Sequence, residues 1–441
     1  MPLAVRRQSM INIAGQAPGS GTEQTLGRRH RPDYWLVVLM MMMLAVGLIV
    51  VYAISPALSQ SAHTSPTHYI SKQLIAISIS IIAFVTTATV PLQTIKKFYI
   101  PLLVLAGIAT LIALITPTNP LYPAHRWVRL GSFSFQSVEL LKFGLLIWLA
   151  ALLSERMRLG KITDIRHTLK PVAAAVVIIG IVVAGIQSDL GSAGVLVAII
   201  GTMVFVAGMP VGRLLAGVSV IAIGVVLLIS STPYRRERLQ TYLHPEQDCQ
   251  AAGYQACQAL IAIGSGGLTG LGLGRSVQAY GYLPEAANDS IFAIFAEKFG
   301  FIGVAALLAV MVAFFGRLKT IAERAPDNFS RLVVMGILAW LSLQAAINIG
   351  AMIGLLPLKG ITLPFISYGG TSVVFAAAAV GLAFQISAYT NMRTAVVNSG
   401  LSGRSGKNKG GQQHDANQDG SGDGRRQRGA YHPNPGGRAR A

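Results

Sequence analysis

Charged residues are scarce in this sequence. Only 12% of the 441 residues are charged and just 17 are acidic, whereas 52% are hydrophobic and the mean hydropathy is +0.55. Soluble globular domains contain about 25% charged residues. The composition therefore excludes an ordinary soluble protein and indicates a protein that has the lipid bilayer as its solvent.

The start of the chain also lacks the features of a cleaved signal peptide. Residues 1–33 are polar and carry five arginines, and the apolar run after them exceeds the roughly 7 to 15 residues of a signal peptide. We expect this segment to be a disordered, basic cytoplasmic tail. Residues 392–441 are rich in glycine and arginine, and from Ser399 they have almost no aliphatic side chains, so we expect a second disordered tail there.

Long apolar runs are abundant. The first begins at Tyr34 and continues for about twenty uncharged residues, which as a helix cross a hydrocarbon core of about 30 Å. About ten such segments predict an all-α polytopic membrane domain over residues 34–391. The segments begin near Tyr34, Ile70, Phe98, Val138, Pro171, Gly191, Leu214, Asp289, Leu332 and Gly370.

The connections between these segments alternate in charge. If both termini are cytoplasmic, about 26 of the 36 Lys and Arg residues lie in the tails and cytoplasmic loops, as the positive-inside rule requires. Topology and anionic lipid headgroups thus account for the net charge of +19, and we expect no nucleic-acid partner. The prediction is an N-in, C-in protein with a large extracytoplasmic loop, residues 232–288, between the seventh and eighth helices.

This large loop contains a glycine-rich stretch and both cysteines of the chain. The stretch "GSGGLTGLGLGRS" is no phosphate-binding loop, because no lysine follows Gly272 and no G-x-G-x-x-G fits. We expect a flexible loop or a turn that dips into the membrane. Cys249 and Cys257 are candidates for a disulfide in an oxidising compartment, and two free thiols are equally compatible with the spacing. Metal binding by these cysteines is the least supported alternative.

Three carboxylates surround the start of the eighth helix, in "YLPEAANDSIFAIFAEKFG". Asp289 is either the N-cap of that helix or a functional group. In a helical turn, Glu285 would share a face with Asp289, where the two like charges repel unless a cation or substrate intervenes. Glu297 lies deeper, where an ionised group is costly, and we expect it to pair with Lys298 or with a cation of another helix.

Several Arg and Lys side chains are predicted on the outer side of the membrane, against the positive-inside rule. They are Arg126, Arg129, Arg275 and Lys359. Such cations bind phosphate oxygens and suit a lipid-linked diphosphate, although snorkelling to outer headgroups is the simpler alternative. Trp127 is by default an interfacial anchor.

Four segments of the chain form a set: "HRWVRLGSFSFQSVELLKF", "GIQSDLGSAGVL", "GSGGLTGLGLGRSVQAYGYLPEAANDSIFAIFAEKFGFIG" and "NIGAMIGLLPLKGITLPFISYGGTS". In this order, they resemble the signature stretches of the SEDS family (shape, elongation, division and sporulation). The resemblance spans about 33–390. Within the family, "YLPEA" and the lysine of "PLKG" favour the division member over the elongation member.

This resemblance implies a ten-helix peptidoglycan glycosyltransferase that polymerises lipid II on the outer face of the bacterial cytoplasmic membrane, at the division septum. It implies a class B penicillin-binding protein as partner, together with other division proteins. The family's essential aspartate falls on Asp289, although Ala287, Asn288 and Ser290 depart from the usual "PExHTDFIF" pattern. No cofactor is certain, and a divalent cation such as Mg²⁺ or Mn²⁺ at the diphosphate stays open.

The remaining candidate residues fall into two sets. The expected contacts to the diphosphate or to lipid II are Arg126, Trp127, Arg129, Arg275, Lys359, Glu285, Ser367 and Tyr368. The expected polar groups within the membrane are Glu139 and Lys142, which would pair at i, i+3, and Asp189, Glu297 and Asn348.

In the implied reaction, Asp289 is the general base that activates a sugar hydroxyl, and the cations stabilise the diphosphate leaving group. Two other functions remain open. Intramembrane carboxylates would also suit a lipid II flippase, and a non-catalytic scaffold would not need Asp289.

Overall fold

The computed structural model describes residues 28–61, 63–116, 127–130, 133–230, 249–250, 253–358 and 360–390. The predicted N-terminal tail therefore lies outside the described residues except for residues 28–33, and the predicted C-terminal tail, 392–441, lies outside them entirely. Arg126 and Lys359 also lie outside the described residues.

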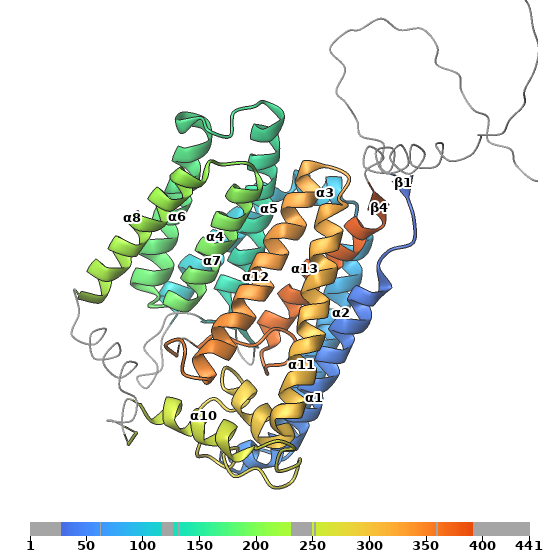
Figure 1. Ribbon diagram of the computed structural model, residues 1–441, viewed down its shortest axis with the longest axis vertical. Coiled ribbons are helices and arrows are strands. Elements are labelled where there is room, and N and C mark those ends of the chain that lie inside the picture. The colour runs from blue at the N-terminus through green and yellow to red at the C-terminus, as the bar shows by residue number, and fades with distance from the viewer. Residues whose placement is uncertain are drawn as a thin grey trace, which may run out of the picture. The chain divides into compact units, whose positions relative to one another are not determined.

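Each of the ten predicted apolar segments coincides with a helix, which confirms the all-α polytopic fold class (Figure 1). Seven helical segments are long and apolar enough to cross a membrane, and three apolar helices in the described part of the chain are shorter. The main helices are α1 (Tyr34–Ser61), α2 (His68–Thr89), α4 (Tyr99–Ile115), α5 (Ser137–Arg158), α6 (Lys170–Ile179), α7 (Leu190–Val206), α8 (Val211–Ser230), α11 (Ile291–Glu323), α12 (Asn328–Met352) and α13 (Gly370–Ser387). The smaller elements are α3 (Leu92–Lys97), α10 (Tyr254–Ser265), the π-helices η1 (Ile165–Leu169) and η2 (Gly180–Ile186), and the strands β1 (Arg28–Arg29), β2 (Trp127–Leu130), β3 (Phe133–Gln136) and β4 (Tyr389–Thr390).

Aspartates cap the main helices α7 and α12. The Asp189 carboxylate accepts a hydrogen bond from Ser192 N (3.0 Å) at the start of α7, and Asp327 accepts from Ser330 N (2.9 Å) at the start of α12. Each cap satisfies a backbone donor that the first turn of a helix leaves open. Asp189, predicted as an intramembrane polar group, is thus a buried N-cap.

Segments that connect the helices contact one another at two places in the described part of the chain. At one end, Arg213 Nη1 donates to Thr163 O (2.7 Å), and Lys96 Nζ lies 5.0 Å from the centroid of the Phe329 ring. At the other end, the turn before α11 contacts α12 and the segment before α13. The number of helices that cross the membrane and the N-in, C-in orientation remain predictions.

Part of the predicted N-terminal tail is ordered. β1 pairs with β4 in an antiparallel ladder, with Arg28 opposite Thr390 and Arg29 opposite Tyr389. Asp33 Oδ2 lies 2.6 Å from Arg317 Nη2 in an ion pair with α11. Composition does not reveal this ordered structure, because the residues that pair with 28–33 lie about 280 to 360 residues further along the chain.

Candidate functional site

The glycine-rich loop packs against a break in α11. Gly300 has φ +63° and ψ −167°, so the helix is interrupted there. Leu271 N and Gly272 N donate to Glu297 O and Lys298 O at 2.9 and 3.0 Å, while Phe301 N and Ile302 N donate to Gly267 O and Leu268 O at 2.9 and 3.1 Å. Irregular backbone is tolerated at membrane depth where such partners satisfy it. The predicted loop is therefore a docked structural element.

The predicted ionic partner of Glu297 is wrong. The buried carboxylate accepts from Ser276 Oγ (2.5 Å), Val277 N (2.9 Å) and Gln278 N (3.2 Å). Lys298 Nζ instead donates to Leu273 O at 2.8 Å. The loop that folds over the α11 break brings its own donors to Glu297, a long-range effect that the neighbouring lysine in the sequence does not reveal.

Asp289 lies in the turn that leads from this loop into α11. The helix begins at Ile291, and its N-cap position is Ser290, one residue after Asp289. The Ser290 hydroxyl donates to Pro284 O (2.9 Å) and closes the turn. Because its side chain is only partly buried, the Asp289 carboxylate is a candidate for a chemical role.

Glu285 and Asp289 do not share a helical face as the i, i+4 spacing suggested. Residues 281–290 form turns, and Glu285 has φ +51°, in the left-handed region. The exposed Glu285 carboxylate accepts a hydrogen bond from Asn288 Nδ2. The two acids therefore differ in environment, and only Asp289 lines the pocket described next.

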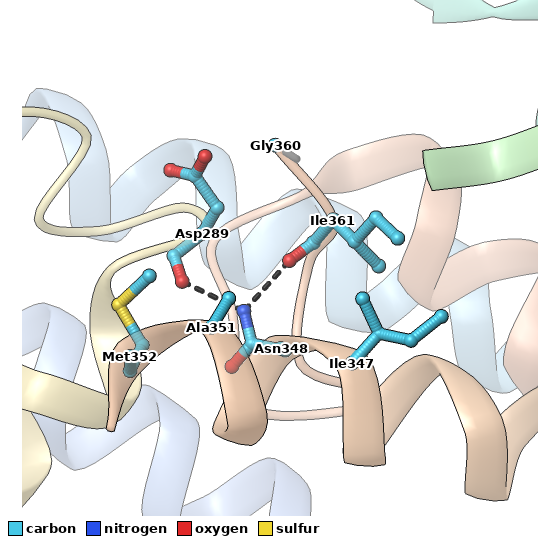
Figure 2. A pocket seen from close by; sticks show the side chains of 7 residues that line it. All are labelled: Asp289, Ile347, Asn348, Ala351, Met352, Gly360 and Ile361. Atoms are coloured by element: carbon cyan, nitrogen blue, oxygen red, sulfur yellow. Dashed lines mark hydrogen bonds between the residues drawn. The ribbon is translucent and has the colours of Figure 1, made fainter. Parts of the chain in front are cut away.

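Asn348 of α12 fixes the backbone on both sides of a small pocket. Its Nδ2 donates to Asp289 O and to Ile361 O, both at 2.7 Å. Figure 2 shows that the Asp289 carboxylate points away from Asn348 while the backbone carbonyl points toward it. Asn348 is 2% exposed, so this amide is a rigid clamp between the Asp289 turn and the segment before α13.

The pocket is lined by Asp289, Ile347, Asn348, Ala351, Met352, Gly360 and Ile361 (Figure 2), and its volume is only about 10 Å³. Sites for whole small molecules usually measure about 300–1,000 Å³. The pocket is far smaller than such a site and has room for about one water molecule.

Tyr368 and Ser367 support the same site through backbone bonds. Tyr368 N donates to Ala287 O (2.8 Å), and Ser367 Oγ accepts from Leu363 N (2.7 Å). Burial, with a smaller contribution from Tyr69, raises the pKa of the Tyr368 phenol to about 12. Tyr368 therefore remains protonated at neutral pH, and these two residues, predicted as substrate contacts, hold the loop in place.

The structure describes the side chain of only one of the four predicted phosphate-binding cations, Arg275. Arg275 is exposed on the glycine-rich loop, and Trp127 of β2 is 39% exposed. The backbone of Arg129 pairs with Ser134 in the β2–β3 hairpin. Arg126 and Lys359 lie outside the described residues, so their predicted role stays a prediction.

The predicted ion pair inside the bundle is present and belongs to a larger network. Lys142 Nζ lies 2.8 Å from Glu139 Oε1 and donates to Gln344 Oε1 at 3.0 Å. Trp340 Nε1 donates to the same Gln344 oxygen (2.9 Å), and Gln344 Nε2 donates to Thr362 O (3.0 Å). Sequence reasoning missed Gln344, although an amide in the middle of an apolar helix was a usable signal.

We expect Lys142→Met to destabilise the fold strongly, because Glu139 and Gln344 would lose a buried partner. Removing one member of a buried pair costs about 3–5 kcal/mol, so Tm in nanodiscs should fall steeply. Replacing both charges, in Glu139→Gln with Lys142→Met, should recover part of the loss. The exposed pair of Arg158 and Glu155 (2.7 Å) is the matched control, and Arg158→Met should leave Tm nearly unchanged. Equal Tm values for Lys142→Met and wild type would contradict this expectation.

The cysteines form a disulfide. Cys249 and Cys257 are bonded, with their Cα atoms 5.7 Å apart. The spacing of the two residues had left this bond and two free thiols open. The bond joins the residues before α10 to the first turn of that helix.

The described residues contain no cluster of three or more His, Cys, Asp or Glu side chains that could hold a metal ion.

Comparisons with known proteins agree on one family. The family model described as "Cell cycle protein" (FtsW, RodA, SpoVE) matches residues 34–392. The chain is 35% identical to stage V sporulation protein E of Bacillus subtilis over 364 residues, covering 82% of this chain and 99% of that protein. It is 38% identical to a probable peptidoglycan glycosyltransferase FtsW of Thioalkalivibrio over 365 residues, covering 82% and 90%.

Two solved structures share the fold. One is "Structural coordination of polymerization and crosslinking by a peptidoglycan synthase complex", with a TM-score of 0.65, 26% identity, and coverage of 81% of this chain and 97% of that one. The other is the rod shape determining protein RodA of Thermus thermophilus, with a TM-score of 0.58, 24% identity, and coverage of 81% and 96%. With a family match over most of its length, this chain belongs to the FtsW, RodA and SpoVE family of cell cycle proteins, the SEDS family that its motifs resemble.

Proposed function

We propose that this protein is a peptidoglycan glycosyltransferase that polymerises lipid II at the outer face of the cytoplasmic membrane, for septal wall synthesis in cell division. The observation that carries the proposal is the Asp289 carboxylate on a small pocket, in a turn that is bonded to α12 and to the segment before α13. Several relatives named as probable peptidoglycan glycosyltransferases FtsW support the activity.

In the proposed reaction, Asp289 takes the proton of the 4-hydroxyl of lipid II's N-acetylglucosamine. That oxygen attacks the anomeric carbon of the growing chain's terminal sugar, and the bond to the undecaprenyl diphosphate breaks. One displacement on an α-linked donor gives a β-linkage. A sugar hydroxyl is a poor nucleophile, and a positioned base is typically worth roughly 10² to 10⁴ in rate.

The fixed position of the carboxylate is as important as its basicity, because catalytic groups act through geometry set before the reaction. Asn348, Tyr368 and Ser290 each bond the backbone of the 284–290 turn. Arg126, Arg129, Arg275 and Lys359 would bind the diphosphate, whose charge grows as the bond breaks.

The partner that we propose is a class B penicillin-binding protein, which would crosslink the strands. Its support is the structural similarity to the protein in a complex that coordinates polymerization and crosslinking. Site and partner are compatible with elongation as well as division, and the preference for division rests on "YLPEA" and the "PLKG" lysine.

The test is polymerisation of lipid II by the purified protein with its transpeptidase partner in liposomes. Formation of glycan strands is the expected result. If no strands form and labelled lipid II instead crosses the bilayer, the protein is a flippase and the proposal is wrong.

We also expect Asn348→Asp to lower kcat about tenfold or more, with a smaller change in KM. The substitution preserves the shape of the side chain but replaces the N–H donors that hold Asp289 O and Ile361 O, and buried carbonyls without partners cost about 1–3 kcal/mol each. Steady-state polymerisation kinetics measure the two parameters. An unchanged kcat would show that the clamp does not position Asp289.

A further inference from the structure

The helix α10 lies at the same end of the bundle as the start of α11 (Figure 1), and the proposed reaction assigns it no role. It has 12 residues, begins after Gly253 without a side-chain cap, and has no acidic residue in its first turn. Isolated helices of this length are marginal in water. The Cys249–Cys257 disulfide is a covalent constraint on the first turn of α10, a helix that also packs against α11.

The first turn of α10 is connected to the Asp289 turn by a chain of two hydrogen bonds. Gln255 Nε2 donates to Ser290 Oγ at 3.0 Å, and Ser290 Oγ donates to Pro284 O at 2.9 Å. Ser290 is fully buried and follows Asp289 directly. Gln255 thereby orients the hydroxyl that closes the turn on which the Asp289 carboxylate stands.

The other end of α10 is held by close backbone packing. A Cβ on Gly266, just after the helix, would lie 2.2 Å from Ala296 O of α11, so only glycine permits this approach. Because this end cannot shift without moving the α11 backbone, a loosened first turn would change the Gln255–Ser290 contact in particular.

We infer that Gln255 is a positioning residue for Asp289, and that the Cys249–Cys257 disulfide makes this positioning dependent on redox state. The inference rests on the proposed function for its effect on polymerisation, while its structural part concerns the 284–290 turn alone. A dithiol reductant would break the S–S bond, giving two electrons and two protons to the cysteine sulfurs and closing into its own disulfide.

The structural part is tested by hydrogen exchange of peptides covering 284–290, in protein that is oxidised or treated with dithiothreitol. Asn288 N and Ser290 N donate to Glu285 O at 2.9 and 3.2 Å. Reduction should speed exchange of these amides about tenfold, and so should Gln255→Ala in the oxidised state. Unchanged exchange, with free thiols verified by alkylation, would overturn the inference whether or not the protein polymerises lipid II.

The functional part is tested by polymerisation kinetics on the same samples. Reduction of wild type, Gln255→Ala, and Cys249→Ser with Cys257→Ser should each lower kcat about tenfold with KM within twofold. The double serine variant should not respond to dithiothreitol, and Gln255→Ala should lose little more on reduction, because both changes act through one contact.

Gln258 provides the matched control on α10. It makes no hydrogen bond to residues 284–290, all of which are described, so Gln258→Ala should behave as wild type. Equal losses for Gln255→Ala and Gln258→Ala would overturn the positioning role. If oxidised wild type makes no polymer while hydrogen exchange responds to reduction as expected, the proposed function fails. The redox-dependent positioning of the 284–290 turn by Gln255 then still stands.

Discussion

Asp289→Asn should reduce lipid II polymerisation at least a hundredfold and leave the protein folded. The substitution removes the carboxylate base, worth roughly 10² to 10⁴ in rate, and preserves the size of the side chain. The fold should tolerate it because Asn348 binds the backbone carbonyl of Asp289 and because the cap position of α11 belongs to Ser290. Strand synthesis with the partner transpeptidase, at equal amounts of folded protein, measures the effect.

Glu285→Gln is the matched control for Asp289→Asn. It removes a carboxylate from the same turn, but this carboxylate is exposed and accepts from Asn288. We expect its rate to remain within a few-fold of wild type. Equal losses in both variants would mean that the negative charge of the turn matters, and Asp289 would lose its role as the base.

Gly270→Ala should prevent the glycine-rich loop from docking on α11. Gly270 has φ +82°, and a Cβ there would lie 2.1 Å from Lys298 O, which is backbone and cannot rotate away. The loop carries the donors that satisfy Glu297 and the helix break at Gly300, so its displacement would expose several buried polar groups, each costing about 1–3 kcal/mol. A steep fall in Tm and in the yield of folded protein is the expected result.

Gly272→Ala separates this steric clash from backbone strain. Gly272 has φ +85°, almost the same as Gly270, but nothing lies within 4 Å of the position that a Cβ would take there. Its alanine variant should lose only about 1–2 kcal/mol, the cost of a left-handed conformation. If the two variants have the same Tm in nanodiscs, close packing of the loop on α11 is not what stabilises this region.

The sequence by itself determined the helices and the neighbourhood of the site. Uncharged runs of about twenty residues require helices in a bilayer, where each backbone group must be satisfied within its own segment, and all ten predicted segments coincide with helices. Local spacing also revealed the pair of Glu139 and Lys142, since residues at i, i+3 are neighbours on any helix.

Only the tertiary structure decided which groups complete the site. Asn348 lies 59 residues from Asp289, and the donors to Glu297 lie 19 to 21 residues before it. Neither separation along the sequence matches the spacing of neighbouring residues on one helix or strand, so no local sequence pattern predicts these contacts. They arise because the glycine-rich loop folds over the α11 break and because α12 packs against α11. The same packing brings Gln255 to Ser290, whereas the bond between Cys249 and Cys257 depends on a 5.7 Å Cα separation that spacing in the sequence leaves open.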